Sequence, residues 1–144
     1  MASYSWLVFA LLSAFFAALV AIFGKIGLQG VDTNLATAIR AVIMAAFLVG
    51  VVALQGRLEN LGTVFANHKA LFFIVLSGVA GAVSWLCYFL ALRMGDVSKV
   101  APIDRLSVVF AIVFALVFLG EKLSWKAGIG AALMAAGAVI LAMG

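Results

Sequence analysis

The fold of this chain is decided by residues 99–121, which read KVAPIDRLSVVFAIVFALVFLGE. The uncharged part, 106–120, is too short alone to cross a hydrocarbon core about 30 Å thick, because a spanning helix needs about 20 residues. The helix must therefore begin near Ser98 and carry Asp104 and Arg105 into the membrane. An ionisable residue there costs about 2.5–3.5 kcal/mol on insertion scales, so it normally faces a partner or a water-filled cavity. Both charged residues are thus candidates to line a substrate pathway.

The composition indicates a membrane protein. Of the 144 residues, 68% are hydrophobic and 10% are charged, whereas soluble domains are about 45–50% apolar and about 25% charged. Its nine basic residues are scattered, which is typical of membrane flanks and does not predict nucleic-acid binding. One unit over 1–144 with an all-α, polytopic fold is predicted, and its five transmembrane helices are expected at about 6–28, 33–54, 70–92, 98–120 and 125–143.

Residue types for catalysis or metal binding are sparse. Cys87 is the single cysteine and lies in an apolar segment, while His68 is the single histidine and lies in a connecting loop. We find no nucleophile–base pair, metal cluster or phosphate-binding loop in the sequence. We therefore expect no enzymatic activity, no cofactor and no metal.

Polar residues of the second span fall on one helical face. Thr33, Thr37, Arg40 and Met44 follow at i, i+4, i+7 and i+11. Asp32 or Thr33 can cap the helix start, and Arg40 lies about 10 Å beyond it. Two interpretations stay open for Arg40: its side chain reaches the head groups, or it is a fixed positive charge at the edge of a cavity. With the second interpretation, Thr37 belongs to the same pathway.

The third span carries a stripe of small and hydroxyl-bearing residues. The stripe and its aromatic neighbours are Ser77, Gly81, Ser84 and Tyr88, with Trp85 and Phe89 alongside. Close helix packing is one interpretation, because small residues such as Gly81 let backbones approach in lipid. A cavity wall is the other, in which Trp85 and Tyr88 offer apolar faces with polar tips. The candidate pathway residues on this span are Ser77, Ser84, Trp85 and Tyr88.

A charge pair between the second and fourth spans is compatible with their depths. Asp104 lies about 9 Å beyond Ser98, close to the depth of Arg40, and both helices start on the same side. The pair is either structural or part of a substrate pathway. Desolvation would favour a protonated Asp104 that could carry a coupling proton, whereas a nearby Arg40 would favour the carboxylate. Pro102, the single proline, predicts a mild bend in the same helix.

The fifth span is predicted to pack against other helices. Residues 127–144 contain no polar side chain, and Gly130, Ala131 and Gly137 suit tight helix contact. Ser124 is placed to cap the start of this helix.

Three segments resemble a known transporter family. They are YFLALR at 88–93, VAPIDRLSVV at 100–109 and LGEKL at 119–123, and they are similar to the EamA unit of the drug/metabolite transporter superfamily. The resemblance covers essentially the whole chain and suits the branch with a single five-helix unit. It implies four helices around a central cavity, a fifth helix outside, and Glu121 in a structural Gly-Glu signature. The acidic first-helix residue that small multidrug transporters use for proton exchange is absent here.

The basic residues hardly favour one orientation in the membrane. Five spans put the chain ends on opposite sides. Four basic residues lie on the amino-terminal side of the membrane: Arg57, Lys69, Lys122 and Lys126. Three lie on the other side: Lys25, Arg93 and Lys99. A difference of one gives little bias, and Lys25 is long enough to reach the head groups.

The odd number of spans also predicts how two copies pair. Two-unit transporters with an odd helix count per unit hold their halves inverted. We therefore expect an antiparallel homodimer of ten helices with dual topology. A parallel dimer or a partner from a different gene stays open.

These features together predict a multi-pass transporter in the plasma or inner membrane, in contact with membrane lipid. We expect it to move a small organic metabolite or drug-like solute by alternating access, coupled to protons or by exchange. Two alternatives stay open. One is a flippase for a lipid-linked intermediate, which needs a cavity open to lipid. The other is a non-transporting membrane subunit, in which Arg40 and Asp104 would matter only for folding.

Overall fold

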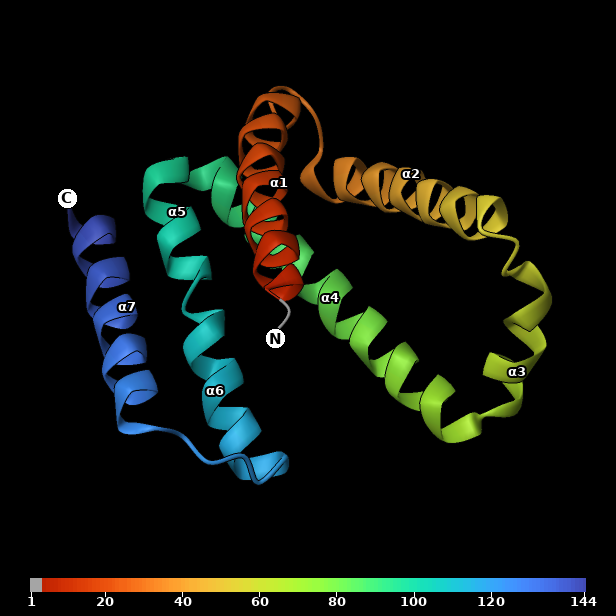
Figure 1. The fold of residues 1–144 in the computed structure, drawn as a ribbon. Coiled ribbons are helices and arrows are strands. Elements are labelled where there is room, and N and C mark those ends of the chain that lie inside the picture. The colour runs from red at the N-terminus through yellow and green to blue at the C-terminus, as the bar shows by residue number, and fades with distance from the viewer. Residues whose placement is uncertain (1–3) are drawn as a thin grey trace. The chain divides into compact units, whose positions relative to one another are not determined.

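The computed structural model describes residues 4–144, and every regular element in that range is a helix. The elements in chain order are α1 (Ser5–Gly27), α2 (Thr33–Leu54), the 3-10 helix η1 (Leu58–Asn60), α3 (Leu61–Ala66), α4 (His68–Met94), α5 (Val97–Asp104), α6 (Ser107–Phe118) and α7 (Trp125–Met143) (Figure 1). Five candidate membrane spans result, with α5 and α6 together forming the fourth. The predicted all-α, five-span fold is confirmed.

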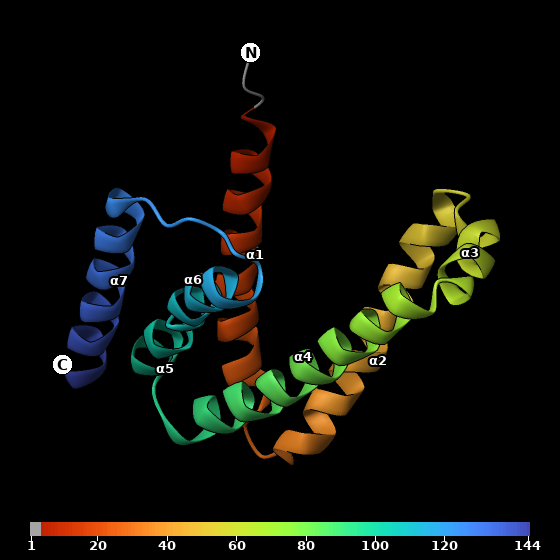
Figure 2. The same ribbon diagram turned by 90° about the horizontal axis from the view of Figure 1, so that it is seen from below.

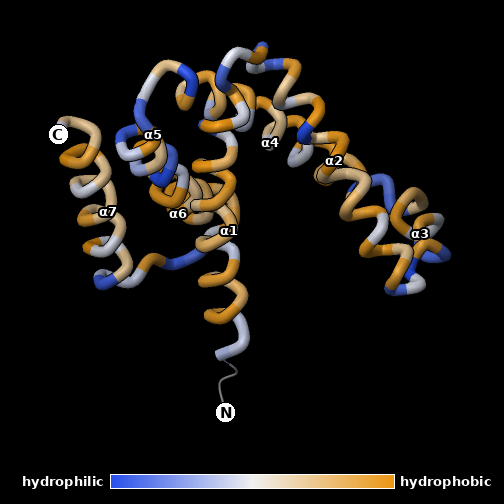
Figure 3. The backbone as a smooth tube through the Cα atoms, turned by 90° about the horizontal axis from the view of Figure 1, so that it is seen from above, coloured by the Kyte–Doolittle hydropathy of each residue, from blue (hydrophilic) through white to orange (hydrophobic). Residues whose placement is uncertain are grey.

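The spans are helical because a chain in lipid must satisfy its backbone hydrogen bonds internally. Hydrophobic residues dominate α1 and α7, while hydrophilic residues gather around α3 and in the connection that leads to α7 (Figure 3). Side chains cap two of the spans as predicted. Asp32 accepts a hydrogen bond from the Leu35 N–H at 2.9 Å at the start of α2, and Ser124 accepts one from the Ala127 N–H at 3.2 Å at the start of α7.

The chain divides into two compact units by its internal contacts. Among the described residues, the first comprises 4–26 and 91–144, and the second comprises 27–90. In the first unit, α7 runs antiparallel to α5 and α6 and packs most extensively against α5 (Figures 1 and 2). Ala138 on α7 is buried. In the second unit, α2 and α4 are two long arms joined by η1 and α3, and they separate toward α3 (Figure 1).

The fourth span begins and ends differently from the expectation of one helix capped by Ser98. Asp96 is the N-cap residue, and α5 starts directly after it. The helix then stops at Asp104, and α6 resumes at Ser107. Pro102 lies inside α5, where its missing N–H deprives the carbonyl of Ser98 of its usual donor. The predicted mild bend is therefore an interruption of the helix.

Backbone hydrogen bonds around this interruption are those of a tightened turn. The Arg105 N–H is shared between the carbonyls of Ala101 at 3.3 Å and Pro102 at 3.1 Å. The N–H of Val108 then donates to the Arg105 carbonyl at 3.1 Å, an i to i+3 bond of the 3-10 type. Irregular backbone at membrane depth is tolerated only where it is buried in protein or lines a water-filled cavity. We therefore expect the break to face another helix or a water-filled cavity in the membrane.

Few side chains of residues 4–144 are buried inside the chain. The buried set is Ala21, Leu28, Thr33, Thr37, Phe89, Leu92 and Ala138. In the apolar stretch of each candidate span, between 0% and 6% of the residues are buried inside the chain. Large exposed apolar surfaces need lipid or another protein chain as cover. This exposure is the pattern of a multi-pass membrane protein.

Lys25 makes a specific contact that its sequence context did not predict. Its ammonium donates to the carbonyls of Leu92 at 2.5 Å and Gly95 at 2.7 Å, at the end of α4. The last carbonyls of a helix lack helical donors and form the negative end of its dipole. A half-buried ammonium is more stable against these carbonyls than extended along α1. Lys25 therefore caps α4 from another helix.

Candidate functional site

The guanidinium of Arg40 lies against two aromatic rings of α4. Arg40 is the single charged residue of α2. Its Cζ atom is 3.6 Å from the centre of the Trp85 ring and 4.2 Å from that of the Phe89 ring. Measured along the helix axis from the end of α4 at Met94, Phe89 lies about 8 Å and Trp85 about 14 Å inside the span. Arg40 lies about 10 Å from the start of α2, which is between these two depths. The three side chains therefore meet at one depth.

The aromatic rings stand at steep angles to one another. Trp85 and Phe89 are i and i+4 neighbours on one face of α4, with ring centroids 6.4 Å apart and planes at 88°. The guanidinium cannot lie flat on both of two such rings at once. Tyr88 packs on Phe89 at 5.5 Å and 70°, and it interacts electrostatically with Arg40. We call Arg40, Trp85, Tyr88 and Phe89 the arginine cluster.

Both terminal nitrogens of Arg40 lack a hydrogen-bond acceptor. Nη1 and Nη2 are buried, and neither donates a hydrogen bond within the described part of the chain. Cation–π contacts contribute about 0.5–2 kcal/mol, whereas arginine at the middle of a span costs about 2.5–3.5 kcal/mol on insertion scales. The rings offset only part of that cost. The cluster is thus a fixed cation with unused hydrogen-bonding capacity beside apolar rings.

The other residues expected in the pathway are placed differently. The Thr37 hydroxyl is buried and donates to the Thr33 carbonyl at 2.7 Å, so its proton is engaged within α2. Ser77 and Ser84 are exposed on α4, and Ser77 lies about 12 Å from Trp85 along the helix. The structure therefore brings Arg40 together with aromatic residues and not with Ser77. A role of these hydroxyl groups in a pathway stays a prediction.

Phe89 belongs to the arginine cluster, but it was not among the pathway residues predicted from the sequence. It is 2% exposed and contacts the guanidinium as well as both neighbouring rings. Its position four residues after Trp85 was the available signal. A phenylalanine at helical spacing is also the usual mark of packing, so the pattern alone could not assign it to the cluster.

Asp104 and Arg105 lie at the interruption of the fourth span. Asp104 is the last residue of α5 and is half-buried, whereas Arg105 is exposed and forms the C-cap. Both belong to the first compact unit, and Arg40 belongs to the second. The attraction between Arg40 and Asp104 stays a prediction.

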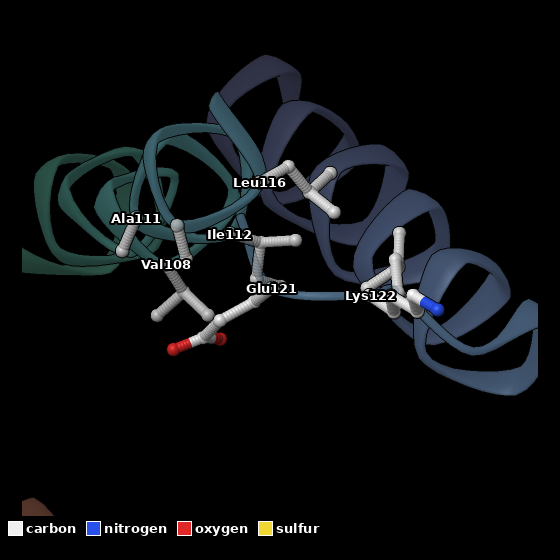
Figure 4. Close-up of a pocket in the computed structure, with 8 residues that line it drawn as sticks. Val108, Ala111, Ile112, Leu116, Glu121 and Lys122 are labelled. Atoms are coloured by element: carbon white, nitrogen blue, oxygen red, sulfur yellow. The ribbon is translucent and has the colours of Figure 1, made fainter. Parts of the chain in front are cut away.

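The glycines expected to pack have open space beside them. A Cβ atom added at Gly81, Gly130 or Gly137 would meet no atom within 4 Å, and Ala131 is half-buried. The first unit also contains a hollow of about 280 Å³, lined by Val108, Ala111, Ile112, Ala115, Leu116, Glu121, Lys122 and Leu123. Figure 4 shows the Glu121 carboxylate and the Lys122 ammonium pointing in different directions. The expected pathway residues do not line this hollow.

The Gly-Glu pair that follows α6 ends this helix through its backbone. Gly120 adopts a φ of 64°, in the left-handed region that favours glycine. This turn lets the Glu121 N–H donate to the Ala115 carbonyl at 3.2 Å. Carbonyls at a helix end need such donors.

Comparison with known proteins identifies the family. The EamA-like transporter family matches residues 4–143. A protein of Sinorhizobium sp named "Uncharacterized transporter in cobO 3'region" is 43% identical over 141 residues, which cover 98% of this chain and 99% of that protein. No solved structure matches the chain. Together with the five apolar helices, these findings indicate a multi-pass membrane transporter rather than an enzyme. The chain belongs to the EamA-like transporter family, as a single five-helix unit.

Proposed function

We propose that this protein transports a small organic solute across the plasma or inner membrane by alternating access, with the arginine cluster on the solute's path. The observation that carries the proposal is the Arg40 guanidinium, whose Nη1 and Nη2 are buried in a membrane span without an acceptor. In a transporter, a solute or water molecule in a central cavity can accept the hydrogen bonds that Nη1 and Nη2 donate. A purely structural helix would be more stable with an apolar residue there.

The fourth span supports the same proposal independently. Its helix is interrupted directly after Asp104, where two charged residues follow one another. Broken helices with charged side chains at membrane depth are features of substrate and ion sites in transporters. Asp104 is thereby the candidate for a coupling proton, and exchange of solutes is the alternative form of coupling.

We further propose that two copies pair in opposite orientations. At most 6% of the assessed residues of each span are buried, so the chain by itself encloses little of its apolar surface. The open space beside Gly130 and Gly137 would let a helix of another copy approach α7 closely. Since one unit has five spans, only an inverted copy restores the internal symmetry of two-unit transporters.

Uptake into proteoliposomes tests the transport proposal. The purified protein is first screened for metabolites that raise its unfolding temperature, because a ligand of the native state stabilises it. Hits are then offered as labelled solutes to proteoliposomes. We expect saturable uptake that is lost in Arg40→Met and retained in Arg57→Gln, which removes an exposed charge outside the spans. If Arg40→Met is destabilised but transports normally, the cluster is not on the solute's path, and its role is structural.

Reporters fused to the carboxyl terminus test the pairing proposal. Alkaline phosphatase is active only outside the cytoplasm, and a suitable fluorescent protein fluoresces only inside it. In a protein of dual topology the carboxyl terminus lies on both sides, so both fusions should give comparable signals. A signal from only one of the two fusions contradicts the inverted pair. A cysteine cross-link between copies at Met134, which lies at the middle of α7 between Gly130 and Gly137 and is introduced as Met134→Cys together with Cys87→Ser, then tests whether α7 lies at the interface.

A further inference from the structure

We propose that Arg40 binds an oxyanion of the transported solute, a carboxylate or a phosphate, and that Trp85 and Phe89 cover the guanidinium when no solute is bound. This inference rests on the proposed function and names the chemical class of its substrate: an organic anion with a flat apolar body. The geometry that carries it is the buried pair Nη1 and Nη2 together with two rings within 4.2 Å of Cζ.

The unused donors of Arg40 specify the ligand's head group. The two terminal nitrogens of a guanidinium form a planar fork that matches the two oxygens of a carboxylate or phosphate. Such charge-assisted hydrogen bonds are stronger than neutral ones and are strengthened further by a low local dielectric. An anion also compensates the charge of Arg40, which an aromatic ring does only weakly. A neutral or cationic head group offers the fork no comparable partner.

The rings specify the body of the ligand. In the present conformation Nη1 and Nη2 are buried, so a neighbouring side chain must move before an anion reaches them, and the two rings against Cζ are the contacts that the structure shows there. Trp85 is half-buried and Phe89 is buried, so the Trp85 side chain has more room to move. A displaced ring still lies beside the site, where it can stack on a flat apolar group. Ligand binding should therefore change the surroundings of the Trp85 indole.

Tryptophan fluorescence and thermal unfolding of the full-length protein test the inference. The chain has three tryptophans, so Trp6→Phe combined with Trp125→Phe leaves Trp85 as the single tryptophan, which is excited selectively at a wavelength that tyrosine does not absorb. The probes are benzoate, phenyl phosphate and the neutral benzamide, at constant ionic strength and up to about 50 mM, above the millimolar dissociation constants of fragment-sized ligands. We expect benzoate or phenyl phosphate to shift the Trp85 emission and raise the unfolding temperature, and benzamide to do neither. Whichever anion is stronger identifies the head group.

Variants show whether the response depends on the guanidinium fork. Arg40→Lys keeps the charge but lacks the fork, so it should weaken benzoate or phenyl phosphate binding about tenfold, and Arg40→Met should abolish it. Arg57→Gln should respond as the unmodified protein does. An equal response to benzamide, an unchanged response in Arg40→Met, or no response to either anion overturns the inference. If Arg40→Met does not fold, the comparison of benzoate with benzamide in the unmodified protein decides.

The experiments must separate two sources of the oxyanion, a free solute and an anionic lipid. They must also show whether a negative result contradicts the anion site or the transport proposal. An Arg40-dependent response to phosphatidylglycerol in the micelle, with none to the soluble probes, overturns the solute site and assigns the oxyanion to lipid instead. An Arg40-dependent response to benzoate in a protein that transports nothing keeps the anion site and rejects the transport proposal. Saturable uptake of a cationic solute without any response to the anions keeps transport and rejects the anion site.

Discussion

The ammonium of Lys25 lies 2.7 Å from the carbonyl oxygen of Gly95, and this contact joins the end of α1 to the end of α4. A second hydrogen bond, to the carbonyl of Leu92, uses another of the three ammonium donors. Leu92 is fully buried. A positive charge at a helix carboxyl end is stabilised by the dipole as well as by the individual hydrogen bonds. Lys25 is therefore a structural residue of the first compact unit.

Replacement of Lys25 tests this role. Lys25→Met keeps the length of the side chain but removes both hydrogen bonds, and we expect the free energy of unfolding to fall by about 1–2 kcal/mol, since bonds to charged groups contribute about 1.5–3 kcal/mol and the site is only half-buried. Unfolding in mixed micelles with increasing dodecyl sulfate measures the change. Lys25→Arg is the matched control and should retain most of the stability. Equal stability of the Met and Arg variants would contradict the capping role.

Gly120 should tolerate few other residues, because its φ of 64° lies in the left-handed region. A Cβ atom there meets nothing within 4 Å, so the effect of Gly120→Ala is a backbone effect alone. We expect a loss of about 1–2 kcal/mol in the free energy of unfolding. Gly120→Asn should lose less, because asparagine visits this region more readily. Equal losses for Ala and Asn would indicate that the turn can rearrange.

Pro102 should be destabilising where it stands. Inside a helix, proline removes one hydrogen bond and clashes with the preceding turn, at a cost of about 3 kcal/mol. Pro102→Ala restores the donor for the Ser98 carbonyl, so we expect a stability gain of about 1–3 kcal/mol in the same unfolding assay. Helical content by circular dichroism should change little, because the interruption after Asp104 lies beyond the hydrogen bond that Pro102 removes. A loss of stability would mean that packing around the interruption depends on the proline ring.

Asp104 gives a test of proton coupling that follows from the proposed function. A coupling proton on its carboxyl group predicts that Asp104→Asn abolishes accumulation of solute driven by a pH gradient in proteoliposomes, while exchange across the membrane continues. Asp96→Asn is the matched control, because Asp96 makes no side-chain capping hydrogen bond and is exposed. An Asp104→Asn protein that still concentrates its solute would leave exchange or another coupling ion.

The polar residues show which parts of the site sequence reasoning can reach. The depth of Arg40 followed from the rise of 1.5 Å per residue, and helical spacing placed Trp85 and Tyr88 close together on α4. The contacts of Arg40 with Trp85 and Phe89 did not follow, because an aromatic ring at helical spacing has no feature that separates packing from binding. The contact of Lys25 was not predicted for a related reason: 70 residues separate it from Gly95, and no local pattern reports such a contact.

The sequence alone determined the five spans, the cap at Ser124 and the membrane class, and it narrowed the cap of the second span to Asp32 or Thr33, because helix formation in lipid depends on local hydropathy and on hydrogen bonds between near neighbours. The tertiary structure alone decided that Arg40 lies against Trp85 and Phe89 and that Lys25 caps α4. It also turned the bend near Pro102 into an interruption at Arg105. Those features depend on which side chains meet across different helices, and a polar side chain in an apolar surrounding adopts whichever contact best compensates its charge and donors.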